Sequence, residues 1–272
     1  MQKLNWRVSR IVSRLRPAIF RWFASLRMKC FLLFLAALLI SLGIFRSIDV
    51  FSALPGEKAE AEYAVYSRGL RVGELRTFTS SMPDGGRKSL KFTGNTHINI
   101  NLLVYSYHLD SEEEALLEEK ETVGYQRTTR ENGHTCQVKG RLENGRFLLT
   151  IDQDGARRAM NVKRGEYDHT TMDCPELGLR HEGDEAVFRV LDLDTLGVVP
   201  RKYRWLRSEE MTVNGKRIIC RVIDFQDPNK KCRRWITQGE VGALIARQDG
   251  KGKSGVYTLR MTRFNSAFKA EE

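Results

Sequence analysis

Side chains that can bind a metal ion are densest between residues 168 and 181. Carboxylate, imidazole and thiol groups occur there at Asp168, His169, Asp173, Cys174, Glu176 and His181. Their spacing matches no closed zinc pattern such as paired C-x-x-C or H-E-x-x-H. Asp173, Pro175 and Glu176 instead have the spacing of a capping box with a proline inside the first turn. We therefore expect a short helix that packs against or plugs a sheet. A metal-dependent enzyme centred on Asp168, His169, Asp173 and His181 is the alternative.

Motifs of known catalytic sites do not favour an enzyme. The sequence contains no G-x-S-x-G nucleophile elbow and no G-x-x-x-x-G-K-[ST] phosphate loop. The histidines His97, His108 and His134 fall on different predicted strands, where isolated histidines are usually structural. We predict a non-catalytic protein without a cofactor.

Aromatic residues on the later predicted strands form the candidate binding face. A curved sheet leaves a concave apolar face that either packs on its own helix or holds a ligand. We predict an apolar or lipidic ligand at this face, with ordinary core packing as the alternative. The candidate residues are Tyr203, Trp205, Trp235, Tyr257 and Leu259. Basic residues on the same strands are expected on a solvated outer face, with lipid headgroups as the alternative partner; they are Lys202, Arg204, Arg221, Arg233, Arg234 and Arg260.

Four cysteines, Cys136, Cys174, Cys220 and Cys232, are candidates for disulfides if the domain lies in an oxidising compartment. A turn at residues 227–229 places Cys232 opposite Phe225, so that Cys220 lies about 17 Å further along its strand. A bond between Cys220 and Cys232 needs a different register, and a disulfide to Cys174 is better placed. Buried thiols are the alternative.

The elements that position these groups follow a membrane segment. Residues 1–29 contain eight lysines and arginines and no acid, so they carry +8 of the net charge of +11. They are expected to form a basic amphipathic segment on the cytoplasmic side, or else a disordered tail. Residues 30–46 are predicted to be a transmembrane helix, with a cleaved signal peptide as the alternative. The remaining +3 gives no reason to expect nucleic-acid binding.

Residues 47–59 read as a linker, residues 60–266 as a periplasmic β-domain and residues 267–272 as a tail. Alternating apolar residues and repeated two-residue turn signals predict a mainly β fold, a curved antiparallel sheet forming a half-barrel or open barrel with a short helix. A bulge or break is expected at residues 101–103, and residues 111–119 are either a helix or a charged strand tip. The turn signals are Asp84-Gly85, Asn132-Gly133, Asn144-Gly145, Asp154-Gly155, Asn214-Gly215 and Asp249-Gly250.

Residues 60–265 resemble the bacterial domain of unknown function 3108. The resemblance rests on an early segment with Tyr63, Val65, Tyr66, Gly69, Val72 and Gly73, on Asp168 before a short helix, and on a late hairpin with Asn214-Gly215, Cys220, Trp235 and Leu259. It implies a Gram-negative envelope protein with a curved sheet similar in shape to lipoprotein carriers of the LolA kind. It implies no activity and no site residues.

The expected function is non-catalytic binding of an apolar or lipidic ligand, or of an envelope component, by an inner-membrane protein with a periplasmic domain. The expected partners are the inner membrane, a lipid or lipoprotein, and an envelope protein. A membrane-anchored scaffold for protein–protein contacts is the first alternative, and the metal-dependent enzyme is the second.

Overall fold

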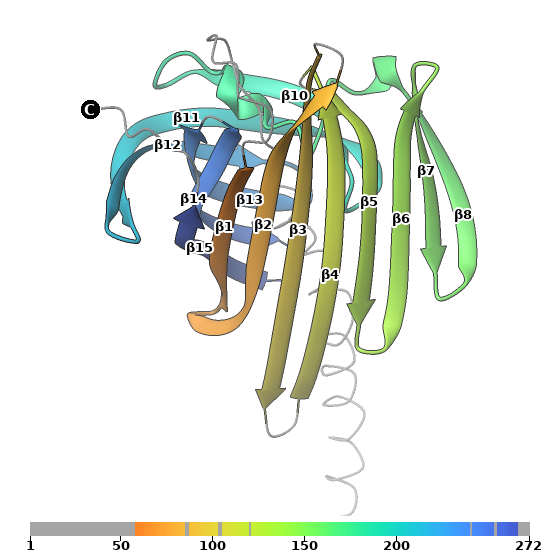
Figure 1. Ribbon diagram of the computed structural model, residues 1–272, viewed down its shortest axis with the longest axis horizontal. Coiled ribbons are helices and arrows are strands. Elements are labelled where there is room, and N and C mark those ends of the chain that lie inside the picture. The colour runs from red at the N-terminus through yellow and green to blue at the C-terminus, as the bar shows by residue number, and fades with distance from the viewer. Residues whose placement is uncertain are drawn as a thin grey trace, which may run out of the picture.

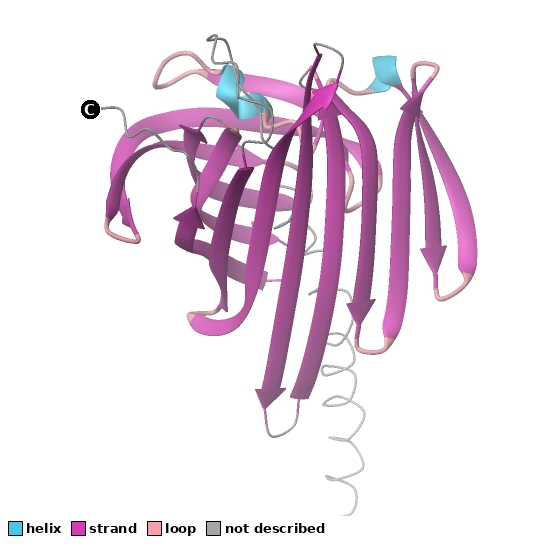
Figure 2. Cartoon of the chain, in the orientation of Figure 1, coloured by secondary structure: helices cyan, strands magenta, loops and turns pink. Residues whose placement is uncertain are grey.

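The computed structural model describes residues 58–84, 87–102, 105–119, 121–239, 241–252 and 255–265. The predicted basic segment, transmembrane helix and C-terminal tail lie outside these residues. Within them, no helix is both long and apolar enough to cross a membrane. Strands make up most of the described chain (Figure 2).

Fifteen strands and two short 3₁₀ helices form the domain. In chain order they are β1 (Lys58–Ser67), β2 (Leu70–Asp84), β3 (Arg87–Leu102), β4 (Tyr105–Glu118), β5 (Glu121–Glu131), β6 (His134–Glu143), β7 (Arg146–Gln153), β8 (Ala156–Lys163), η1 (Arg164–Glu166), β9 (His169–Thr170), η2 (Pro175–Gly178), β10 (Glu185–Asp192), β11 (Gly197–Val213), β12 (Lys216–Gln226), β13 (Lys230–Gly239), β14 (Gly242–Gly252) and β15 (Gly255–Asn265).

All fifteen strands belong to one open, curved sheet. Its order is β8-β7-β6-β5-β4-β3-β2-β1-β15-β14-β13-β12-β11-β10-β9, so the first and last strands of the domain pair in the middle of the sheet. Neighbouring strands are antiparallel, apart from the two-residue β9, which is parallel to β10. The prediction of a mainly β fold with a large curved sheet is confirmed.

The hairpin turns follow the predicted signals at four positions. In each, both turn residues have the positive φ that a tight hairpin requires; the turns are Asn132-Gly133, Asn144-Gly145, Asp154-Gly155 and Asn214-Gly215. The fifth predicted turn signal, Asp84-Gly85, lies at the end of the β2–β3 hairpin, where Asp84 pairs with Arg87. The sequence analysis missed the turn at Arg68-Gly69.

The turn predicted at Asp249-Gly250 is wrong, because both residues lie inside β14. Gly250 pairs with Tyr257, and a Cβ at this glycine would lie 2.0 Å from Cε1 of the tyrosine ring. The glycine therefore makes room for an aromatic ring. Gly250, Gly252 and Gly255 also have the spacing of a dinucleotide fingerprint, but that motif needs a strand followed by a helix, and here it joins two antiparallel strands.

The expected irregularity at residues 101–103 is a reversal of the chain. Leu102 ends β3 and pairs with Tyr105 at the start of β4, which explains the change of parity in the apolar pattern. Residues 111–118 belong to β4, so the strand alternative is correct for this acidic stretch. The predicted capping box is wrong. η2 is a 3₁₀ helix of four residues whose N-cap is Cys174, with φ of 42°, and its cap makes no side-chain hydrogen bond.

The sheet curls until the segment after β8 meets β5. Thr122 on β5 lies 2.8 Å from Thr170 on β9, measured between the hydroxyl oxygens. Arg127 on β5 donates to Asp194, in the β10–β11 connection, at 2.8 Å. These side-chain contacts form what we call the seam. Figure 1 shows β11–β14 behind β1–β3, and β6–β8 on the other side of β5.

Candidate functional site

An irregular segment, Tyr167–Leu179, packs into the hydrophobic core of the curved sheet; we call it the plug. It contains β9 and η2 and only short stretches of regular structure, because Pro175 and the left-handed Cys174 prevent a longer helix or strand. Met172 is 0 % exposed, and most residues from Thr170 to Leu179 are buried in the main hydrophobic core. The sequence expectation of a short helical element that plugs the sheet is confirmed.

The carboxylate of Asp173 holds one part of the plug against β5. Its Oδ1 accepts hydrogen bonds from the hydroxyls of Thr122 and Thr170, and its Oδ2 accepts one from the backbone N–H of Thr170 at 2.7 Å. Burial raises the pKa of this carboxyl, against these hydrogen bonds. This anchor consists of side-chain contacts across the seam and could open without breaking a strand ladder.

The carboxylate of Glu176 holds the other part of the plug against the inner face of β13. It forms a buried ion pair with Arg234, and the side chains are 1 % and 4 % exposed. The Nε–H of Arg234 donates to Oε1 of Gln248 at 2.9 Å, and Nε2 of Gln248 donates to the hydroxyl of Tyr257 at 2.6 Å. Cys232 Sγ lies 3.4 Å from the same hydroxyl. We call these five residues the Arg234 cluster.

The prediction of a solvated outer face is wrong for Arg234, and also for Arg221, which contacts the plug at the carbonyl of Leu179. The guanidinium of Arg234 lies on the face that carries Cys232 and stacks 4.8 Å from the centroid of the Phe225 ring. Alternation on β13 contained this signal, since Cys232, Arg234 and Ile236 share one parity and Lys231 and Arg233 the other. Arg233 does lie outside, where it pairs with Asp224.

Four of the five predicted binding-face residues lie on the inner side with the plug. Tyr203, Trp205, Tyr257 and Leu259 are between 0 and 8 % exposed and belong to the main core. Arg221 connects the plug to this face. Its Nη1–H donates to the carbonyl of Leu179, and its guanidinium carbon lies 4.3 Å from the centroid of the Trp205 ring. Trp235 has the opposite parity to Arg234 and lies under the guanidinium of Arg247, so it faces away from this group.

The residues of the predicted metal enzyme are separated. Asp168 forms an ion pair with Arg189, which lowers the pKa of the carboxyl to about 2. The His169 ring packs edge-on against Phe188 and its Nδ1 lies 3.9 Å from the buried Asp173. His181 is exposed in a turn that is held by Asp184. These four side chains do not converge on one point.

The four candidate cysteines are thiols and form no disulfide. Cys232 faces Phe225, as the sequence predicted, and this register keeps it away from Cys220. Burial raises the pKa of Cys174 well above its ordinary value and that of Cys220 to about 12. Cys136 is the one that is only half-buried. The alternative of buried thiols therefore holds for three of the four.

A hollow of about 640 Å³ opens on the surface near the β12–β13 turn. Lysines and polar residues of β10–β14 line it, among them Lys202, Asp227, Lys231 and Lys251. None of the five residues of the predicted binding face is among its lining residues. The predicted face is therefore separate from this hollow.

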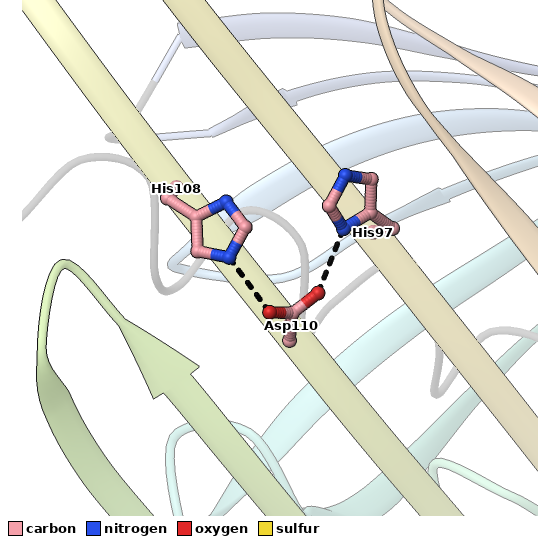
Figure 3. Close-up of side chains that lie close together, drawn as sticks. All are labelled: His97, His108 and Asp110. Atoms are coloured by element: carbon pink, nitrogen blue, oxygen red, sulfur yellow. Dashed lines mark hydrogen bonds and ion pairs between the residues drawn. The ribbon is translucent and has the colours of Figure 1, made fainter.

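Two histidines that the sequence analysis treated as isolated lie together with an aspartate. His97 on β3 is the cross-strand partner of Asp110 on β4, and His108 precedes Asp110 by two residues on the same face. His97 Nδ1 lies 2.7 Å from Oδ1 of Asp110, and His108 Nε2 lies 2.7 Å from Oδ2 (Figure 3). Within the described residues, these three form the group whose donor atoms lie close enough to hold a metal ion. The register of the β3–β4 hairpin, which the sequence pattern did not give, brings these three residues together.

Comparison with known proteins gives one likeness of fold. The chain is similar to a solved structure described as a β-barrel-like protein of domain of unknown function DUF1849 from Brucella abortus, with a TM-score of 0.51 and 9 % sequence identity. The match covers 78 % of this chain and 99 % of that chain. No family model matches the sequence, and no curated protein does. The likeness supports the barrel-like fold and nothing more specific.

Proposed function

We propose that this chain is a non-catalytic binding protein of the bacterial envelope, and that its ligand is an anionic amphiphile such as a fatty acid or an acidic phospholipid. The ligand takes the place of residues 172–179 of the plug, while β9 stays paired with β10. Its acidic group pairs with Arg234, and its apolar chain packs on the inner face at Tyr203 and Leu259. The buried ion pair between Glu176 and Arg234 is the observation that carries the proposal.

That ion pair supports an exchangeable site because Arg234 needs an anionic partner inside a dry core. Removing one partner of a buried pair leaves an uncompensated charge, at a cost of about 3–5 kcal/mol. The carboxylate or phosphate of a ligand can replace the Glu176 carboxylate at the same guanidinium. Gln248 and Tyr257 are already hydrogen-bonded to one another beside it.

The apolar side chains of the plug occupy the space that an alkyl chain needs. Met172 and Leu177 are 0 and 4 % exposed within the main core. Each buried methylene of a ligand contributes about 0.8 kcal/mol, so a chain of about twelve methylenes recovers about 10 kcal/mol. This is comparable to the cost of withdrawing two leucine-sized side chains and breaking the contacts of Asp173 and Glu176.

We infer the cellular location from the charge pattern of the sequence. The basic residues before the apolar run, Cys30–Phe45, favour an N-terminus in the cytoplasm and a domain in the periplasm of a Gram-negative cell. The resemblance to the domain of unknown function 3108 agrees with this location. A reporter enzyme fused after Glu272 that is active only in the cytoplasm would contradict it, and a mature chain lacking residues 1–46 would favour the cleaved signal peptide.

Ligand binding can be followed through Cys174, since this buried thiol lies on the plug. We expect oleate, or vesicles containing phosphatidylglycerol, to accelerate alkylation of Cys174 in the full-length protein and to leave the wall residue Cys220 unaffected. Phosphatidylcholine vesicles test whether the acidic group is required. Unchanged alkylation of Cys174 with every lipid would remove the proposal.

Arg233 and Arg234 provide a matched pair of variants for the same assay. Arg234→Gln is expected to abolish the response to anionic lipid, and Arg233→Gln, on the outer face, to keep it. Glu176→Gln weakens the hold of the plug and is expected to increase alkylation even without lipid. If Arg234→Gln does not fold, the Glu176→Gln variant still decides, because an unchanged rate contradicts an exchangeable ion pair.

The scaffold alternative rests on a different feature, the strand edge at β8. β8 ends the sheet order, and most of its residues are exposed. An extended segment of another protein can add to such an edge. Crosslinking from Arg158 in cells that captures an envelope protein, together with no lipid response of Cys174, would favour this alternative.

A further inference from the structure

The cluster of His97, His108 and Asp110 has the donor set of a transition-metal site. Its two imidazole nitrogens and its carboxylate point toward one another from the same face of the β3–β4 hairpin (Figure 3). The side chains are 50, 49 and 41 % exposed, so an ion can reach them from solvent. The two rings are inclined by 71° with centroids 5.3 Å apart, and therefore do not stack on one another.

We propose that these three residues bind one divalent transition-metal ion, with Zn²⁺ as the best match. Imidazole nitrogen and carboxylate oxygen are common zinc ligands, and three protein ligands with an open fourth position is the pattern of a zinc site that keeps a water. The donor atoms all lie within 4.8 Å of one another. Bonds of about 2.0–2.1 Å to a tetrahedral ion place ligand atoms about 3.3 Å apart. The two 2.7 Å contacts must therefore open slightly, and any wider separation between donor atoms, at most 4.8 Å, must close.

Two antiparallel strands fix the geometry before the ion arrives. Side chains of cross-strand partners stand next to each other on one face, which places His97 beside Asp110. The next cross-strand partners in this row are Glu74 on β2 and Arg130 on β5, both exposed. Arg130 is the neighbouring cation that a bound metal must tolerate. The carboxylate of Asp110 nevertheless accepts its hydrogen bonds from the two histidines.

The carboxylate of Asp110 lies between the two imidazoles and is hydrogen-bonded to both. Hydrogen bonding to His97 lowers the pKa of Asp110, with a further contribution from His108. This site shares no residue with the plug or the Arg234 cluster, and its test is independent of the proposed lipid binding.

Zn²⁺ titration by calorimetry, with the full-length protein purified in detergent without a polyhistidine tag, tests the site. We expect one equivalent of Zn²⁺ to bind and His97→Ala or His108→Ala to weaken binding at least tenfold, since even loss of outer hydrogen-bond partners costs about 10–100-fold. Asp110→Asn keeps the shape of the side chain, removes its charge, and is expected to have the same effect.

The pair of His134 and Asp154 is the matched control. It has the same kind of contact, 2.8 Å from Nδ1 to Oδ2, but a single imidazole. His134→Ala is expected to leave Zn²⁺ affinity unchanged, and Cys136→Ser checks that the half-buried thiol is not the ligand. Equal affinity in the wild type, His97→Ala and His108→Ala would overturn the proposal, as would loss of binding in Cys136→Ser alone. Melting temperatures measured without metal show whether each variant is folded.

Discussion

Replacing Glu113 by glutamine should make the protein more stable at alkaline pH. Glu113 lies on β4, next to the seam, and is 3 % exposed. Its Oε1 accepts a hydrogen bond from the hydroxyl of Tyr125 at 2.6 Å, and its Oε2 has no hydrogen-bond partner among the described residues. Burial raises the pKa of this carboxyl to about 7, although the guanidinium of Arg127 acts in the opposite direction.

The sign follows from the protons bound in each state. Between its ordinary value of 4.5 and about 7, the Glu113 carboxyl is protonated in the folded chain and ionised in the unfolded chain. The folded state therefore binds more protons, and the free energy of unfolding falls as the pH rises through this window. This difference in pKa corresponds to about 3 kcal/mol in the free energy of unfolding. The protonated carboxyl contributes this stability in full below pH 4.5, and the contribution is lost above pH 7. Glutamine is neutral at every pH and keeps an acceptor for Tyr125.

Urea unfolding of the full-length protein, followed by tryptophan fluorescence at pH 5, 6, 7 and 8, tests this reasoning. Glu113→Gln should match the wild type at pH 5 and exceed it by up to about 3 kcal/mol at pH 8. Glu112→Gln, at an exposed position on the same strand, should follow the wild type. If the free energy of unfolding changes with pH in the same way for the wild type and Glu113→Gln, Glu113 is already ionised in the folded protein and the reasoning is refuted.

Two further substitutions test the plug and the sheet. Asp173→Ala leaves the donors of Thr122 and Thr170 without their acceptor, so we expect a loss of about 2–4 kcal/mol in urea unfolding; a loss below 1 kcal/mol would mean that the plug is held elsewhere. Gly250→Ala places a Cβ within 2.0 Å of the Tyr257 ring and should cost about 3 kcal/mol or prevent folding, whereas Gly252→Ala meets its nearest atom at 3.4 Å and should be nearly neutral; equal melting temperatures would contradict this close packing.

The sequence predicted the features that depend on neighbouring residues. Asn132-Gly133 and Asn214-Gly215 are turns because both residues tolerate positive φ, and this is a local property. Asp249-Gly250 carries the same signal and is not a turn, since that glycine is required by a tyrosine on the neighbouring strand. The reversal between β3 and β4 was missed as a turn because the sequence there, Leu103-Val104, contains no turn residue.

The candidate site depended on contacts that no local pattern contains. Glu176 and Arg234 are 58 residues apart, and Arg127 and Asp194 are 67 apart. Alternation along β13 could place Arg234 inside the sheet, but it could not name its partner. The histidine and aspartate cluster differs, because the register of a single hairpin is sufficient to bring its members together.

The seam connects the stability of the barrel-like sheet to the access of a ligand. Strand ladders hold every other junction of the sheet, but β5 and the plug meet through side chains such as Thr122 and Thr170. A neutral contact of this kind contributes about 1 kcal/mol, and the charged hydrogen bond between Arg127 and Asp194 contributes about 1.5–3 kcal/mol, so side chains alone hold this junction. Glu113 and Asp194, whose pKa values burial raises to about 7, both lie beside Arg127 at this junction. Ionisation of these two carboxyls at alkaline pH therefore costs stability at the seam, which is where the plug would separate from β5 to admit the proposed ligand.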